Sequence, residues 1–262
     1  MSKLSHVVCI LAATLALLAA CGSGGGSEET SSPSVAATST ARADPLGSAP
    51  PVSPPATINT PDPQGNLFGN PNFENGRDPW YSLKQPDFIL SGDQAQSGGH
   101  SALLQMRDTV DETGAKVYYL VQEIQPQDFP EVLSGYYRVQ NWKRGTAKQY
   151  MQFVVIAFDV KNLPENFPNH QIRYPLAGID TQPFPIGNAK FVFISKDEPV
   201  QGEWVHFERN IKEDFQQLWG AAPQGFTKLR ILFEVRYDDK VAGDGAPEAD
   251  VYYDDLYIGS AH

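Results

Sequence analysis

The stretch Leu229-Arg230-Ile231-Leu232-Phe233-Glu234-Val235-Arg236-Tyr237 decides the fold class. Large apolar side chains occupy every second position, and the charged side chains of Arg230, Glu234 and Arg236 stand between them. Successive side chains of a β-strand point to opposite faces of a sheet. The alternation therefore predicts a strand with one face in the core and the other face polar.

Similar segments recur along the chain, separated by Gly, Pro, Asn and Asp. The predicted strands are Ala102–Arg107, Val117–Ile124, Glu131–Gln140, Gln149–Asp159, Lys190–Ser195, Glu203–Ile211, Thr227–Tyr237 and Val251–Ile258. Only Asn210–Gly220 predicts a short helix, in which Phe215 and Trp219 share a face. Many strands and one helix predict an all-β fold, with two antiparallel sheets packed as a β-sandwich.

Charge and cysteine content exclude several classes of site. The 262-residue chain has a formal net charge of −11, and an acidic surface repels phosphate backbones, so we expect no nucleic acid partner. Its two cysteines, Cys9 and Cys21, both precede the predicted strands. Disulfides, zinc–thiolate sites and cysteine nucleophiles are therefore excluded from the folded part.

The first residues predict export. A nearly unbroken apolar run, Val7 to Ala20, ends in Leu18-Ala19-Ala20-Cys21, which resembles the lipobox of bacterial lipoproteins. The resemblance implies a signal peptide over residues 1–20, a lipid on Cys21, and a location on the extracytoplasmic face of the cell membrane. The run is short for a permanent membrane helix, which needs about 20 apolar residues. An ordinary cleaved secretory signal and an uncleaved anchor are the alternatives.

Residues 21–65 contain mainly Gly, Ser, Thr, Ala and Pro, with few large apolar side chains. Such a segment has little to bury against the entropy cost of ordering, so it predicts a disordered linker. Residues 66–262 then form the folded domain, which we expect the linker to hold away from the membrane.

Four motifs, taken in order, resemble those of galactose-binding-like jelly rolls, which include the carbohydrate-binding modules of families 4, 9 and 22. The motifs are Asn66-Leu67-Phe68-Gly69-Asn70-Pro71-Asn72-Phe73-Glu74-Asn75-Gly76 followed by Trp80, Ser97-Gly98-Gly99-His100-Ser101-Ala102-Leu103, Gly202-Glu203-Trp204, and Val251-Tyr252-Tyr253-Asp254-Asp255-Leu256. The resemblance implies a jelly roll with its first and last strands side by side, and a carbohydrate as the ligand.

The same resemblance implies a structural calcium ion between the first and last strands. Its ligands would be Glu74, Asp254 or Asp255, and nearby backbone carbonyl groups. Calcium takes six to eight oxygen ligands, and a cation relieves the repulsion between neighbouring carboxylates. The alternative is that Glu74 caps a turn and the two aspartates are solvated.

Sugar-binding sites combine aromatic rings with amide, carboxylate and guanidinium groups on one polar face. The candidates on or beside the predicted central strands are Tyr137, Trp142, Tyr150, Gln152, Glu234 and Arg236. Tyr150 and Gln152 share a strand face, and so do Glu234 and Arg236. The alternatives are that the aromatic side chains are core residues and that Glu234 and Arg236 form a solvated pair.

The sequence offers little for catalysis. We find no close E-x-D-x-x-E pattern of acids. His206 and Glu208 are two positions apart and share a strand face, but no third catalytic partner follows, so His206 is expected to be a core-strand histidine. We therefore expect a non-catalytic carbohydrate-binding lipoprotein that works beside a separate glycan-degrading enzyme. A glycoside hydrolase or lyase on the same sandwich, and a structural or protein-binding module of the cell envelope, are the alternatives.

Overall fold

A computed structural model describes residues 64–107, 113–164 and 166–261 of the chain. The predicted signal peptide, Cys21 and nearly all of the predicted linker lie outside these residues. The elements within them are β1 (Ile89–Ser91), β2 (Ser101–Arg107), β3 (Gly114–Ile124), β4 (Val132–Lys143), β5 (Lys148–Phe158), β6 (Asn169–Ala177), β7 (Ala189–Phe191), β8 (Trp204–Asn210), α1 (Ile211–Trp219), β9 (Lys228–Lys240) and β10 (Glu248–Gly259).

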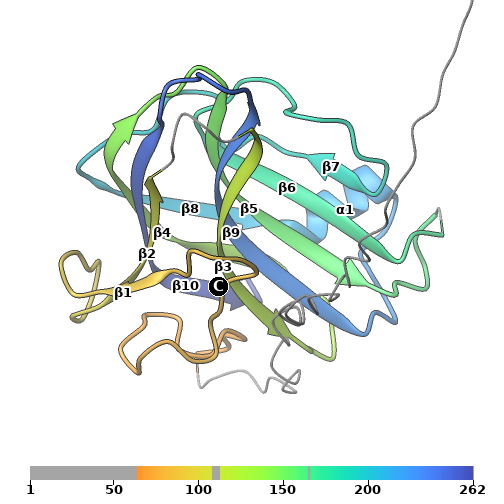
Figure 1. Cartoon of the computed structure of the whole chain (residues 1–262). Coiled ribbons are helices and arrows are strands. Elements are labelled where there is room, and N and C mark those ends of the chain that lie inside the picture. The colour runs from red at the N-terminus through yellow and green to blue at the C-terminus, as the bar shows by residue number, and fades with distance from the viewer. Residues whose placement is uncertain (1–63, 108–112, 165, 262) are drawn as a thin grey trace, which may run out of the picture. The chain divides into compact units, whose positions relative to one another are not determined.

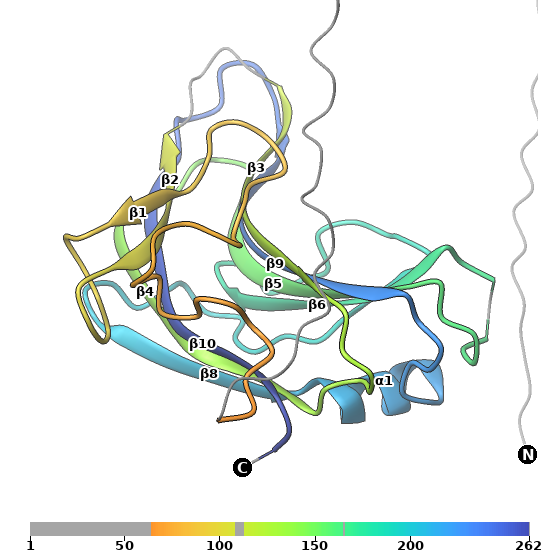
Figure 2. The ribbon, with the colours of Figure 1, turned by 90° about the horizontal axis from the view of Figure 1, so that it is seen from below.

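The strands form two five-stranded sheets that face each other (Figures 1 and 2). One sheet has the order β1-β2-β10-β4-β8 and is called the β10 sheet below; the other has the order β3-β9-β5-β6-β7 and is called the β9 sheet. Each pair of neighbouring strands in the described structure is antiparallel, except that β6 and β7 run parallel. The predicted all-β sandwich is confirmed, with this one parallel pair as a departure.

The alternation in β9 has the predicted consequence. Ile231, Phe233 and Val235 point between the sheets and are fully buried. The Phe233 ring lies 4.9 Å from the ring of Tyr253 on β10, so the two central strands meet through aromatic side chains. Burial of such large apolar surfaces is the main source of stability for the sandwich.

The opening motif covers one end of the core. Trp80 packs against Phe68 and Phe73, with ring centroids 5.0 and 5.5 Å apart. The Leu67 amide donates to the Ile258 carbonyl at 2.9 Å, so the start of the domain lies beside β10 at its end. The first and last strands were expected side by side, but β2 lies between β1 and β10, and the residues before β1 contact the last strand instead.

Helix α1 begins and ends where the sequence indicates. The Asn210 side chain accepts a hydrogen bond from the Glu213 amide, which satisfies one of the free N–H groups of the first turn. Gly220 ends the helix in a left-handed conformation that favours glycine. No helix among the described residues has the length and apolar character needed to cross a membrane.

Four further sequence-based expectations differ from the structure. Strand β6 was not predicted, because Pro175 interrupts its pattern; the β5–β6 register shifts between Met151 and Gln152, where Pro175 pairs. Short β1 was also missed, and the strand predicted at Lys190–Ser195 is only the three-residue β7. His206 is exposed rather than in the core, because Phe207 takes the inward position of β8.

Candidate functional site

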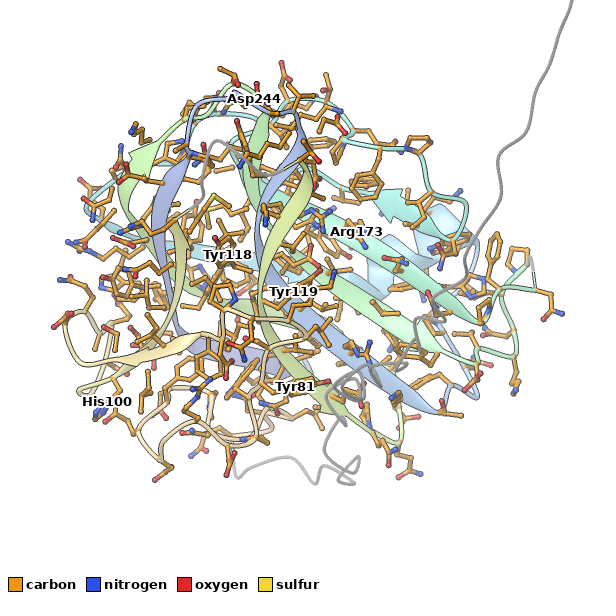
Figure 3. The ribbon with its side chains drawn as sticks, in the orientation of Figure 1. Tyr81, His100, Tyr118, Tyr119, Arg173 and Asp244 are labelled. Atoms are coloured by element: carbon orange, nitrogen blue, oxygen red, sulfur yellow. The ribbon has the colours of Figure 1, made fainter. Side chains whose placement is uncertain are left out.

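The outer face of the β9 sheet carries a connected group of polar side chains. Glu234 on β9 pairs with Tyr119 on β3 and with Gln152 on β5. One row further along the sheet, Arg236 pairs with Tyr150. Figure 3 shows Tyr119 and Arg173 over this sheet. The period of two that places Phe233 and Val235 in the core therefore turns these polar groups to the other side.

Arg236 joins two carboxylates of its own strand. Its Nη1 atom lies 3.1 Å from Oε2 of Glu234, its Nη2 donates to Oδ1 of Asp238 at 2.9 Å, and its Nε donates to Oδ2 of Asp238 at 3.1 Å. The Tyr150 hydroxyl donates to Oδ2 of Asp238 at 2.6 Å. Burial disfavours the charged guanidinium, but the carboxylates outweigh it and raise the pKa of Arg236 overall.

Glu234 also contacts one side chain on β5 and one on β6. Gln152 Nε2 donates to Oε2 of Glu234 at 2.5 Å, and Nη1 of Arg173 on β6 lies 3.5 Å from the same oxygen. Nε of Arg173 donates to Oε1 of Gln171 at 3.0 Å. A single carboxylate thus contacts both arginines and the amide, all at sites that are buried or nearly so.

Phe184 lies over both guanidinium groups. The Cζ atoms of Arg173 and Arg236 are each 5.4 Å from the centre of its ring, within the range of cation–π attraction. A pocket of about 290 Å³ opens beside this ring. It is lined by Gly114, Ala115, Phe184, Arg236, Asp238 and Asp239.

An apolar area continues the same face beyond Glu234. Val121, Val154 and Leu232 pack together there, one from each of three adjacent strands. The half-buried rings of Tyr81 and Tyr119 lie against them. Burial, and then the charge of Glu234, raise the pKa of the Tyr119 hydroxyl, so it stays a neutral donor and acceptor.

Of the six predicted ligand contacts, four come together. These are Tyr150, Gln152, Glu234 and Arg236, all on the outer face of the β9 sheet. They are more deeply buried and more closely paired than the solvated pair that the sequence left open as an alternative.

The other two predicted contacts are placed elsewhere. Tyr137 points between the sheets, 6% exposed, with its ring 6.3 Å from that of Phe207. Register explains the error, since β4 turns Tyr136 outward and Tyr137 inward. Trp142 lies near the end of β4, half-buried against the core, and its Nε1 donates to Oε2 of Glu198 at 2.8 Å.

Five members of this face were not predicted from the sequence. They are Tyr81, Tyr119, Arg173, Phe184 and Asp238. Arg173 lies on the unpredicted strand β6, and Phe184 lies in the segment between β6 and β7, where no periodic pattern exists. Tyr119 had a usable signal, because it alternates with the core residues Tyr118 and Leu120.

The residues expected to hold calcium all contact the segment between β1 and β2. Oε1 of Glu74 accepts from the amides of Gly99 and His100, each at 2.8 Å. Oδ2 of Asp254 accepts from the amides of Gln96 and Ser97, at 2.7 and 3.3 Å. The carboxylates therefore both hold this loop, each through its own pair of amides.

The donor set there does not fit calcium. The oxygens of Glu74 and Asp254 face N–H groups, whereas a calcium ion needs a shell of oxygen atoms. Within the described part of the chain, no three Asp, Glu, His or Cys side chains are close enough to hold a metal ion together. Calcium stays a prediction from the resemblance, and the hydrogen bonds already explain how this loop is held.

A larger pocket, of about 830 Å³, lies at one end of the sandwich. Its walls are mainly the loop residues 125–131 and 222–226. Two charged residues at its wall, Glu131 and Lys212, are paired with each other at 3.1 Å. It lacks the combination of an aromatic ring with buried charged groups that distinguishes the outer face of the β9 sheet.

Comparison with known proteins gives weak likenesses. No protein-family model matches the chain, and no curated protein matches it. Among solved structures, TmCBM61 in complex with β-1,4-galactotriose is 13% identical, with a TM-score of 0.39 and coverage of 74% of this chain and 97% of that one. The C-terminal family 22 carbohydrate-binding module of Clostridium thermocellum Xyn10B is also 13% identical, with a TM-score of 0.38 and coverage of 76% and 96%.

A third solved structure is the enzymatically active domain of bacteriophage CBA120 tailspike protein 4. It is 14% identical, with a TM-score of 0.37, and the match covers 76% of this chain but 22% of that one. Similarity at this level decides nothing about ligand or activity. The functional argument rests on the side chains described above.

Proposed function

We propose that this protein binds extracellular carbohydrate, without cleaving it, on the outer face of the β9 sheet. The ligand lies along the sheet from the pocket beside Phe184 towards Tyr119 and Tyr81. The observation that carries the proposal is the combination of a half-exposed aromatic ring with fixed guanidinium and carboxylate groups at one pocket.

The chemistry of sugars explains why this combination matters. A pyranose has apolar C–H faces that pack on aromatic rings and a rim of hydroxyl groups that need donors and acceptors. Phe184 and Tyr119 supply rings, while Arg236 and Asp238 supply donors and acceptors at the pocket. The pocket of about 290 Å³ is at the lower end of the ~300 to 1,000 Å³ typical of small-molecule sites, which suits one sugar unit.

The geometry favours binding over hydrolysis. A glycosidase needs one carboxyl group that gives a proton and a second that acts as base or nucleophile. Asp238 and Asp239 line the pocket, and Asp239 pairs with Lys148. Asp238 and the neighbouring Glu234 are both bound by the guanidinium group of Arg236. Glu234 and Asp238 are therefore held by one side chain on one strand, and they do not face each other across a cleft.

A glycan array and a cleavage assay together test this proposal. The full chain should bind at least one class of polysaccharide, and Arg236→Ala should lose that binding. Incubation with the bound polysaccharide should release no reducing ends above a protein-free blank. Release of reducing ends that Glu234→Gln abolishes would instead identify a glycoside hydrolase. Failure to bind across the array would leave the alternative of a structural or protein-binding module.

The location of the domain is a second part of the proposal. We propose that a lipid on Cys21 anchors the chain at the extracytoplasmic face of the cell membrane, and that residues 21–65 act as the tether. The lipobox-like sequence Leu18-Ala19-Ala20-Cys21 supports this. A separate glycan-degrading enzyme would then use the captured polysaccharide. Mass spectrometry should find a mature N-terminus at a lipidated Cys21, and Cys21→Ser should release the protein from membranes.

A further inference from the structure

We infer that the outer face of the β9 sheet selects uncharged sugar units and rejects uronic acids and other anionic sugars. This inference deepens the proposed function and rests on it. It follows from how the charges on this face are already paired, and from two polar atoms that are left over.

The positive charges at the site are already neutralised. Arg236 has Glu234 and Asp238 as partners, and Arg173 lies within ion-pair distance of Glu234. At the rim of the pocket, Lys148 pairs with Asp239. Arginine recognises a sugar carboxylate through its paired N–H groups, and here the carboxylates of the protein take that place.

The other charged residues around the pocket leave no excess positive charge there. Two arginines and two carboxylates cancel on the face itself, and Lys148 cancels Asp239. Lys240, further along β9, acts on Asp244, whose pKa is lowered first by a hydrogen bond from Thr146 and only in small part by that lysine. The chain as a whole carries −11. An incoming uronate would meet several carboxylates and no unpaired cation among the described residues of the pocket.

Two buried polar atoms on the face are left without a hydrogen-bond partner in the described structure. One is the Oε1 acceptor of Gln152, and the other is the Nη1 donor of Arg173. Both side chains contact Oε2 of Glu234, so they lie beside each other. A buried donor or acceptor without a partner destabilises the folded state, and a ligand group that pairs with it removes that cost.

A hydroxyl group meets both needs at once, because it donates one hydrogen bond and accepts others. Oε1 of Gln152 and Nη1 of Arg173 are closed to solvent and lie outside the pocket lining, so a ligand hydroxyl reaches them only if these side chains move on binding. A carboxylate only accepts, so in the same place it would leave Oε1 of Gln152 unsatisfied. The charge balance on this face therefore favours a neutral polyol, and the two leftover atoms add to this preference once they are accessible.

The test compares a glycan with its own oxidised form. Take the neutral polysaccharide that binds most tightly in the array, and oxidise its primary hydroxyl groups at C6 to carboxylates, which keeps the linkages unchanged. Titration calorimetry with the full chain should show affinity for the oxidised form reduced about tenfold or more, as expected for charge repulsion in a site without a free cation.

Three variants make the test specific. Glu234→Gln removes one negative charge and frees Arg173, so the ratio of neutral to oxidised affinity should fall towards one. Asp239→Asn, at the exposed rim, should lower the ratio less while the fold is retained. Asp87→Asn makes the same charge change in a surface ion pair with Arg77, outside the site, and should leave the ratio unchanged.

The outcomes separate the inference from the proposed function. Equal or tighter binding of the oxidised form, or array hits confined to acidic glycans, overturns the inference and leaves carbohydrate binding in place. If Glu234→Gln does not fold, a ratio that Asp239→Asn leaves unchanged counts against the role of these charges. Absence of any glycan binding overturns both.

Discussion

The two sheets present different outer faces, although both are built from strands of period two. On the β9 sheet, charged groups bind one another across strands and an aromatic ring lies over them. On the β10 sheet, the ring centres of Tyr136 and His206 are 4.9 Å apart, and Arg138 on β4 lies opposite Trp204 on the adjacent strand β8. The rings of Tyr136 and Trp204 on that second face are half-exposed.

This difference shows that an outward polar or aromatic side chain is a poor marker of a site by itself. The β9 sheet holds its charges at sites that are almost closed to water, where each lost partner is costly. The β10 sheet also holds such a group, Asp250 with Arg107, Gln105 and Asn141. Its Tyr136, Arg138 and His206 lie at half-exposed or exposed positions, where substitution is cheap. Function is therefore expected where the protein maintains costly polar groups in fixed positions.

The largest contrast between the faces should appear in stability. Arg236→Ala leaves Glu234 and Asp238 buried without their shared cation, which should cost about 3 to 5 kcal/mol in the free energy of unfolding. Arg138→Ala, the matched change on the β10 sheet, should cost about 1 kcal/mol or less. Urea unfolding of the two variants measures the contrast, and similar losses would contradict the difference argued between the faces.

Stability should also depend on pH through Asp254 on β10. The hydrogen-bond partners of its carboxylate in the described structure are N–H groups. Burial raises the pKa of Asp254 from its usual value to about 6, and neighbouring Asp255 adds to the effect. Its ionised form is therefore disfavoured in the folded state relative to the unfolded state.

The sign of the pH effect follows from that raised pKa. Asp254 should cost no stability below about pH 4, where it is protonated in both states, and should cost an increasing amount as pH rises to about 6. The full cost above that pH is at most about 3 kcal/mol, because each pKa unit corresponds to about 1.4 kcal/mol. Urea unfolding from pH 4 to 7 should show this loss in the wild type and not in Asp254→Asn.

Substitutions on the two faces should also differ in their effect on glycan affinity, by less than they differ in stability. Phe184→Ala removes the ring over Arg173 and Arg236, and loss of an aromatic contact of about 0.5 to 1.5 kcal/mol should weaken glycan binding roughly 2- to 12-fold. Trp204→Ala removes a larger ring from the β10 sheet and should leave affinity unchanged. Calorimetry with the array-selected glycan tests both. A loss confined to Trp204→Ala would move the site to the β10 sheet.

Much of this difference could be read from the sequence, but not all of it. The alternation in β9 gave both the core residues and the outward Glu234 and Arg236, because strand geometry fixes them. It did not give Phe184 or Arg173, since Phe184 lies in an irregular segment and Pro175 hides β6. Tyr137 was assigned to the wrong side because two adjacent tyrosines are indistinguishable until the register is known.

The smallest expected effect concerns calcium at the β10 sheet. The N–H groups that face Glu74 and Asp254 already hold the segment between β1 and β2, so chelation should leave the melting temperature unchanged. Bound calcium at 100 times its Kd would add about 2.7 kcal/mol, which a thermal melt detects easily. It would also keep Asp254 ionised and remove the pH dependence described above. A rise in melting temperature on adding calcium, together with a flat pH profile, would show that the resemblance predicted the metal correctly and that this loop rearranges to receive it.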